Sequence, residues 1–270
     1  MEYLSRDASN FSTQLWQQID QTVVETAKQQ LVTRRFLSLH GPLGAGASYV
    51  NIDHVDKQEE FSDGSVQIKG REIQPLTQIY QDFPILWRDI EQAKALSQPL
   101  DLSSVAYATS KIAKAEDDLI LFGDPSQHID GLFTVKDSHK IKRGDWSTGE
   151  EAFQDVAKAI GYLVSNNMVG RYALILSPEL YLQLHRLQTS VGLLELDRIA
   201  KLVDGRIHPV GDYGKSKAAL ICCQPQYVDL AIGVDLTTAY LEQKDLNHYL
   251  RILETLALRI KEPKAIVHFQ

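Results

Sequence analysis

The part of the chain from residue 247 to residue 261 most constrains the fold, because its side chains alternate between two sets. The apolar set is Leu250, Ile252, Leu256, Leu258 and Ile260, and the opposite set is Tyr249, Arg251, Thr255, Arg259 and Lys261. A period of two is typical of a β-strand with one buried face. Glu254 interrupts the apolar set, so its carboxylate must be paired or must reach solvent.

The residues that follow extend this pattern to the end of the sequence. Pro263 ends the hydrogen-bonded ladder, and the short apolar run from Ala265 to Phe269 predicts a last strand. A long strand with two different faces has to be covered by something. We therefore expect a protein that packs against copies of itself.

Hydrophobic periodicity predicts several helices and strands upstream. Helices are expected over about Thr13–Thr33, Leu102–Leu121, Ser177–Leu187 and Leu194–Val203, with another starting at Thr148 and capped by Thr148 and Glu151. Strands are expected at Tyr172–Leu176, near Ile207 and near Leu220, and residues 48–82 form a strand-rich arm with a hairpin turn at Asp63-Gly64. The irregular order of helices and antiparallel strands indicates an α+β fold.

The charge pattern disfavours nucleic acid and anionic membranes as partners. The net charge is −7 with both signs interspersed, so no basic stripe exists that could neutralise the phosphates of nucleic acid or of an anionic membrane. A signal peptide and a membrane-spanning apolar stretch are not expected either. Cys222 and Cys223 are adjacent, which disfavours a disulfide and indicates a reduced, cytoplasmic setting; both are interpreted as small buried residues.

No group of residues predicts catalysis, a cofactor or a metal site. The glycine-rich residues 40–46 lack the Lys-Ser/Thr pair of a phosphate-binding loop. The acidic run Glu116-Asp117-Asp118 is interpreted as a solvated helix face, because adjacent carboxylates point in different directions around a helix. A soluble α+β enzyme with an unrecognised active site is the alternative to a non-catalytic protein.

A series of segments in a fixed order is more specific than any single motif. The series begins with MEYLSRDASNFSTQLWQQID and LVTRRFLSLHGPLGAG, and continues with QPLTQIYQDFPILWRDIEQA and LDLSSVAYATSKIAKAEDDLILFGD. GLF, LSPELYLQL, IGVDLTTAY and LRILETLALRIKEPKAIV complete it. Over nearly its whole length, the chain resembles the encapsulin shell proteins, also called linocin-like proteins.

This resemblance implies the α+β fold of tailed-phage major capsid proteins, with a peripheral domain, an axial domain and an extended strand arm. The implied divisions are the N-terminal helix and start of the peripheral domain at 1–47, the arm at 48–80, a part of the peripheral domain with a long helix at 81–130, the axial domain at 131–222 and a return to the peripheral domain at 223–270. The resemblance also implies a shell protein that is not an enzyme. We expect sixty copies to form an icosahedral compartment.

The resemblance implies that the shell encloses a cargo enzyme of the ferritin-like or dye-decolourising peroxidase type, held by its carboxy-terminal peptide. The implied peptide-binding residues are Ala27, Leu31, Arg34, Ser38, Asp235, Leu236 and Thr237. Arg34 stands where the family usually has a basic residue, and Ser38 where some relatives have an acidic one. The alternative for Arg34-Arg35 is a solvated basic helix end.

The resemblance also implies a pore and raises the question of a flavin. The implied five-fold pore loop is Thr189, Ser190, Val191, Gly192 and Leu193, which is small and uncharged and would admit ions and small substrates. The alternative is an exposed turn between helices. Some relatives hold a flavin near an aromatic residue after the arm, but here Arg88 stands at that position. We expect no cofactor, and we expect Trp87 to be a packing residue.

Overall fold

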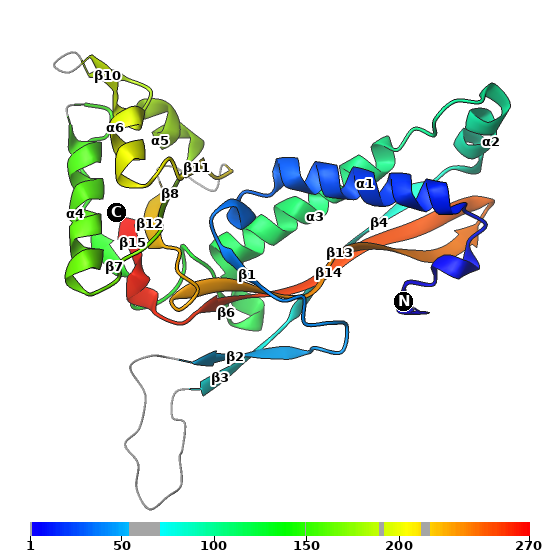
Figure 1. The fold of residues 1–270 in the computed structure, drawn as a ribbon, viewed down its shortest axis with the longest axis horizontal. Coiled ribbons are helices and arrows are strands. Elements are labelled where there is room, and N and C mark those ends of the chain that lie inside the picture. Colours follow the sequence, from blue (N-terminus) through cyan, green and yellow to red (C-terminus); the bar gives the residue numbers. More distant parts are fainter. Residues whose placement is uncertain (1, 54–70, 149, 189–191, 212–216) are drawn as a thin grey trace, which may run out of the picture.

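A long four-stranded sheet runs through the computed structural model, which describes residues 2–53, 71–148, 150–188, 192–211 and 217–270. The order of its strands is β1 (Ser38–His40), β13 (Val228–Lys244), β14 (Asn247–Ile260) and β4 (Thr77–Ile85). β13 and β14 form an antiparallel hairpin whose two turn residues, Asp245 and Leu246, have φ angles of 50° and 68°. Figure 1 shows this hairpin crossing much of the length of the molecule.

The alternation expected for residues 247–261 is confirmed in β14. The buried residues of the apolar set are Leu250, Ile252, Leu256, Leu258 and Ile260. Glu254 lies on the same face and is fully buried, so it has to be paired. From residue 256 onward both faces are buried, because Ala257 packs against Val50 at the base of the arm.

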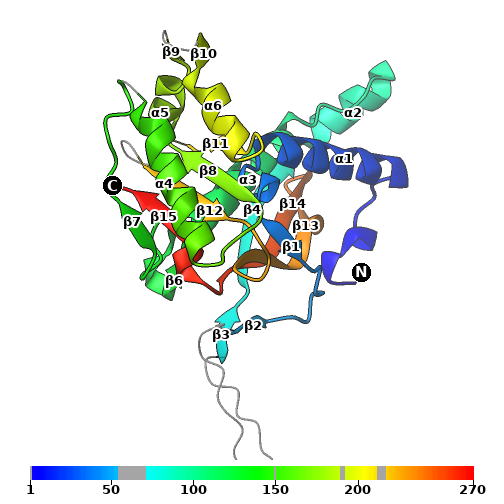
Figure 2. The ribbon, with the colours of Figure 1, turned by 60° about the vertical axis from the view of Figure 1, so that its left-hand side comes forward.

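Two long helices, α1 (Thr13–Gln30) and α3 (Ser103–Phe122), lie side by side over this sheet (Figures 1 and 2). Both predicted helices are confirmed, and the Ser12 side chain caps α1 by accepting a hydrogen bond from the Leu15 amide at 3.1 Å. The core between the helices and the sheet includes Trp16, Ile19, Val23, Val105, Ile112, Leu250 and Ile252. α1 ends three residues before the predicted position and is followed by the short helix η3 (Thr33–Arg35).

A second, five-stranded sheet lies at the other end of the molecule (Figure 1). Its order is β11 (Ile207–Pro209), β8 (Tyr172–Leu176), β12 (Ala218–Cys222), β15 (Ile266–Phe269) and β7 (His139–Ile141). The helices around it are α4 (Glu151–Ser165), α5 (Pro178–Gln183) and α6 (Glu195–Leu202). The predicted strands at residues 172–176, near 207 and near 220 are confirmed, and so is the burial of Cys222 and Cys223.

The end of the chain joins this second sheet. A short helical turn, η6 (Pro263–Ala265), separates β14 from β15, which confirms the predicted break and last strand. β15 pairs antiparallel with β12 and parallel with β7. Segment 223–270 therefore contributes to both sheets. Its strands β13 and β14 lie in the four-stranded sheet, and β15 lies in the five-stranded sheet, where it packs in the core around α4.

Three further local features of the structure differ from what the sequence predicts. The helix α2 (Trp87–Leu96) was not expected from the sequence, and it buries none of its residues. The capping box at Thr148 is wrong: α4 begins at Glu151, whose carboxylate accepts a hydrogen bond from the Asp145 amide at 2.5 Å. The helix expected to reach Leu187 ends at Gln183, because the chain turns there into the short strand β9 (Leu187–Gln188).

The base of the arm is a two-stranded ribbon that extends away from the rest of the molecule (Figure 2). It consists of β2 (Tyr49–Asp53) and β3 (Arg71–Pro75), which are antiparallel. The predicted turn at Asp63-Gly64 lies outside the described residues. The remaining short strands are β5 (Gly123–Asp124), β6 (Ile129–Asp130) and β10 (Leu193–Leu194).

Candidate functional site

A groove between α1 and β13 is the candidate functional site. It encloses a hollow of about 470 Å³ that is lined by Leu4, Arg6, Asp7, Asp20, Val23, Val24, Leu236 and Thr237. Val24 is 45% exposed there and lies beside the other apolar residues of the lining. The groove therefore offers apolar surface that the described residues leave uncovered.

The groove exists because α1 and an irregular part of β13 face each other. The pairing of β13 with β14 shifts register between Val234 and Thr237, which takes Asp235 and Leu236 out of the regular ladder. Leu236 then packs against Ala27 of α1 and against Leu31, which directly follows that helix. Of the residues that the resemblance implied, the structure thus brings together Ala27, Leu31 and Leu236, and Thr237 lines the hollow beside Leu236.

Sequence reasoning missed the part of the groove that extends toward the amino terminus. Asp20, Val23 and Val24 lie one and two turns before Ala27 on α1, so the helical period could have revealed them. Leu4 and Arg6 lie in the short helices η1 (Glu2–Leu4) and η2 (Arg6–Ala8), and no local sequence pattern places them beside α1.

The charge of the groove is mainly acidic. Arg6 donates to both carboxylate oxygens of Asp20 at 2.7 Å, so these two charges compensate each other. Its Nε also donates to the Thr238 carbonyl at 2.9 Å, which fixes η2 against β13. Asp7 adds a further carboxylate to the lining.

Arg34 lies beside this groove, and each of its three nitrogen atoms already donates to a carboxylate. Its Nε donates to Glu116 at 2.6 Å and its Nη2 donates to Glu254 at 2.6 Å. Its Nη1 donates to Asp235 at 2.7 Å. Burial alone would lower the pKa of Arg34, but the carboxylates raise it above its ordinary value, so the guanidinium remains charged.

The solvated helix end offered as the alternative for Arg34-Arg35 is thus wrong for Arg34, whose side chain is only 15% exposed. It fits Arg35, which is exposed and donates to the carbonyls of Leu31 and Gln29 at the end of α1. Arg34 therefore connects α3, β13 and β14, whereas Arg35 caps the end of α1.

In the acidic run Glu116-Asp117-Asp118, Glu116 and Asp117 are buried and Asp118 is half-buried, so the prediction of a solvated face is wrong. Asp117 accepts hydrogen bonds from the Val32 and Thr33 amides at 3.0 Å and from the Thr33 hydroxyl at 2.6 Å. Burial raises the pKa of Asp117, and the hydrogen bonds from Thr33 partly offset that rise. The run faces the connection after α1, which the sequence of α3 alone could not reveal.

Ser38 lies apart from the groove. Its hydroxyl accepts a hydrogen bond from Arg171 at 2.7 Å, and its backbone pairs with Asp229 where β1 joins β13. Of the predicted pore loop, Thr189, Ser190 and Val191 lie outside the described residues. Gly192 has a φ of 69°, and Leu193 opens β10, at the upper tip in Figure 1.

A second hollow, of about 600 Å³, lies between α2 and the start of α1, and its lining includes Phe11, Trp87, Ile90 and His248. Trp87 was expected to be a packing residue, but it is 38% exposed because α2 stands away from the body. The Arg88 guanidinium lies 5.7 Å from the centroid of the Trp87 ring.

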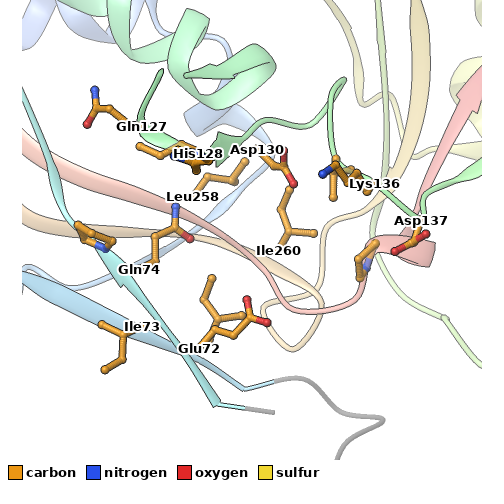
Figure 3. Close-up of a pocket in the computed structure, with 15 residues that line it drawn as sticks. Glu72, Ile73, Gln74, Gln127, His128, Asp130, Lys136, Asp137, Leu258 and Ile260 are labelled. Atoms are coloured by element: carbon orange, nitrogen blue, oxygen red, sulfur yellow. The ribbon is translucent and has the colours of Figure 1, made fainter. Parts of the chain in front are cut away.

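A third hollow, of about 440 Å³, lies at the base of the arm (Figure 3). Glu72 and Gln74 line it from β3, and His128, Asp130 and Lys136 line it from the opposite side. Within the described ranges, no three His, Cys, Asp or Glu side chains are placed to hold a metal ion. None of the helices described combines the length and apolarity needed to cross a bilayer.

Comparison with known proteins identifies the family. The sequence model of the family described as "Encapsulating protein for peroxidase" matches residues 1–257. The type 1 encapsulin shell protein of Myxococcus xanthus is 34% identical in an alignment of 276 positions, which covers 98% of this chain and 95% of that protein. The chain belongs to the encapsulin shell protein family.

Solved structures show the same fold for this encapsulin. The virus-like particle from Pyrococcus furiosus has a TM-score of 0.77 at 20% identity and covers 95% of this chain and 99% of that one. The capsid of the Myoviridae phage XM1 has a TM-score of 0.63 at 15% identity and covers 88% of this chain and 90% of that one. The predicted α+β fold of tailed-phage capsid proteins is confirmed.

The family membership decides the class of function. This encapsulin is a shell protein that assembles into capsid-like nanocompartments, and its role is structural rather than catalytic. The alternative of a soluble enzyme with an unrecognised active site is thereby excluded. Any enzymatic activity of such a compartment belongs to the protein that it encloses.

Proposed function

We propose that sixty copies of this chain close into an icosahedral compartment that encloses a cargo enzyme, and that the groove between α1 and β13 binds the carboxy-terminal peptide of that enzyme. The observation that carries the proposal is the hollow in which exposed Val24 lies beside Leu236 and Thr237. An extended peptide can anchor an apolar side chain in such a groove. The family description, which names a peroxidase as the enclosed protein, supports an enzyme as cargo.

The lining of the groove indicates the chemistry of that peptide. Val23, Val24 and Leu236 favour aliphatic anchors, and the charge of Arg6 is compensated by Asp20. Asp7 then leaves the rim acidic, and Asp235 lies next to Leu236 with its carboxylate exposed but paired with Arg34. We infer a peptide that carries a lysine or arginine next to its apolar residues.

Arg34 has a different role in this proposal from the one that the resemblance implied. Its three donor groups already hold carboxylates, so it shapes the groove through Asp235 instead of contacting the peptide. Ser38 stays a candidate contact only by its position in the family pattern, because it does not line the hollow.

We further propose residues 48–80 as the intersubunit arm, 131–222 as the axial domain, and 1–47, 81–130 and 223–270 as the peripheral domain, apart from the last strand β15, which lies in the sheet of the axial domain. Residues 189–193 would form the five-fold pore for ions and small substrates. We place the compartment in the cytoplasm, where free Cys222 and Cys223 remain reduced. The cargo, ferritin-like or peroxidase-like, would decide between iron storage and defence against oxidative stress.

The assembly is tested by expressing the protein alone and measuring the mass of the particles. We expect uniform hollow spheres in negative-stain micrographs, with a mass sixty times that of the 30.4 kDa chain. Spheres of another copy number would overturn the number sixty and leave the shell intact.

The groove is tested with a fluorescent protein that carries the last residues of the enclosed enzyme, which mass spectrometry of natively purified shells identifies. Val24→Asp should lower the amount retained per shell by about tenfold or more, because it places a charge on the apolar floor. Val164→Asp is the matched control: Val164 is 47% exposed, but lies on α4, far from the groove. Equal retention by both variants would overturn the proposed groove.

A further inference from the structure

The ion pairs of Arg34 contain more negative than positive charge. Glu116 comes from α3 and Glu254 from β14, and both side chains are 0% exposed. Asp235 comes from β13 and is 58% exposed. If all three carboxyl groups were ionised, one guanidinium would face three anions, two of them cut off from water. Burying uncompensated charge in this way is strongly unfavourable.

Two buried carboxylate oxygens that lack a hydrogen bond lie where a single proton could serve both. Arg34 binds one oxygen of Glu116 and one of Glu254, while the second oxygens, Oε2 of Glu116 and Oε1 of Glu254, are buried without a hydrogen-bond donor. The two carboxyl groups lie within hydrogen-bonding reach of each other. Two carboxylates can only accept hydrogen bonds, whereas a protonated carboxyl group can donate one to its neighbour.

We propose that Glu116 and Glu254 share one proton, carried by Glu254, and that this proton allows Arg34 to hold Asp235 at the rim of the groove. The pair is thus a proton-dependent latch between α3, β14 and the irregular part of β13. Its effect on cargo rests on the proposed function of the groove, whereas the shared proton does not.

The electrostatic surroundings agree with this assignment. Burial raises the pKa of Glu254 well above its ordinary value, the charge of Glu116 adds to the rise, and Arg34 opposes it. Burial also raises the pKa of Glu116, and there Arg34 is the main opposing influence. Asp235 of β13 acts on Glu254 and Asp117 of α3 acts on Glu116, both as further negative charges. Across the sheet, β4 places apolar Ile79 opposite Glu254.

The direction of the pH dependence follows from the raised pKa of Glu254. The stability that the protonated group contributes is fully present below pH 4.5, the ordinary pKa of a glutamate, and is lost as the pH rises through the folded-state value. Above that value two buried carboxylates compete for one guanidinium. Asp235, the solvent-exposed partner, is then held least firmly, and the rim that carries Leu236 loosens.

The shared proton is tested by infrared spectroscopy of empty shells. The C=O stretching band of a protonated carboxyl group should be present in the wild type at neutral pH and absent from Glu254→Gln, which mimics the neutral acid. Glu242→Gln, on the exposed part of β13, is the matched control and should keep the band. A wild-type minus Glu254→Gln difference spectrum without this band would overturn the proposal.

Stability gives a second readout that does not depend on cargo. The melting temperature of wild-type shells, relative to that of Glu254→Gln shells, should fall as the pH is raised from neutral. Glu116→Gln serves if Glu254→Gln fails to assemble, because it also removes one of the two competing charges. Parallel pH profiles for the wild type and the variant would contradict a shared proton.

The link to the groove is tested by binding of the cargo-derived peptide at different pH values. Wild-type shells should lose affinity several-fold on going from neutral to alkaline pH, whereas Glu254→Gln shells should bind independently of pH. Equal pH dependence in both would overturn the link between latch and groove. Failure of the peptide to bind at any pH would overturn the proposed function, while the infrared and melting data would still decide the shared proton.

Discussion

Asp229 on β13 and Arg259 directly opposite on β14 form a buried two-point ion pair, with 2.7 Å between Nε and Oδ1 and 2.5 Å between Nη2 and Oδ2. Their side chains are 4% and 11% exposed. Nη1 of Arg259 also donates to the Asn51 carbonyl of β2 at 3.4 Å. The pair therefore connects the long hairpin to the base of the arm, the part proposed to reach a neighbouring subunit.

Asp229→Ala should destabilise the protein by about 3–5 kcal/mol, because it leaves Arg259 buried without a counter-charge. The measurement is the urea concentration at the midpoint of unfolding, compared at an unchanged denaturant slope. Asp82→Ala is the control, since the Asp82–Arg251 pair is 41% and 29% exposed and should contribute at most about 1 kcal/mol. Equal losses in the two variants would contradict a special role for the buried pair.

Gly123→Ala should destabilise the protein severely. Gly123 has a φ of 68° and a ψ of −164°, a backbone conformation essentially restricted to glycine that costs other residues about 1–3 kcal/mol. An added Cβ would also overlap the Ile129 carbonyl oxygen. Gly161→Ala, in the exposed part of α4 with no atom near the new Cβ, should instead stabilise by about 0.5–1 kcal/mol. Thermal unfolding of the two variants checks both signs.

Neither thiol of the native protein should react with thiol reagents at neutral pH. Burial raises the pKa of Cys222 to about 11 and that of Cys223 to about 12, and the thiolate is the reactive form. Titration with a chromogenic disulfide should detect no thiol in native shells and both thiols after unfolding in denaturant. Rapid labelling of native shells would show that β12 opens locally.

His268 should make the protein sensitive to mild acid. Its Nε2 donates to the Leu132 carbonyl at 2.8 Å, and burial lowers the pKa of His268 below the ordinary 6.5. A histidine that is neutral when folded loses its stabilising effect as the pH falls from 6.5 through the lowered value. His268→Gln should flatten the decrease in melting temperature over this range, whereas His185→Gln, on an exposed side chain, should not.

The sequence predicted the elements in which local periodicity and burial agree. Leu250 and Ile252 alternate because that face of β14 packs against α1 and α3, and an apolar residue at every second position is visible in the sequence itself. α2 escaped prediction because it buries no side chain and so has no strong apolar stripe. The capping box at Thr148 failed because both of its side chains bind Asp145 instead. The Thr148 hydroxyl donates to the Asp145 carboxylate, and the Glu151 carboxylate accepts from the Asp145 amide.

The sequence by itself determined that Glu254 must be paired or must reach solvent, and the ordered motifs determined the family and its shell function. Only the tertiary structure decided which partner, because Arg34 lies 220 positions away and reaches Glu254 only after α1, α3 and β14 have packed together. The same packing buries Glu116 and Asp117, which look like a solvated acidic run in the sequence. Local patterns record which faces are apolar, but the pairing of buried charges depends on contacts between distant segments, and these exist only in the folded chain.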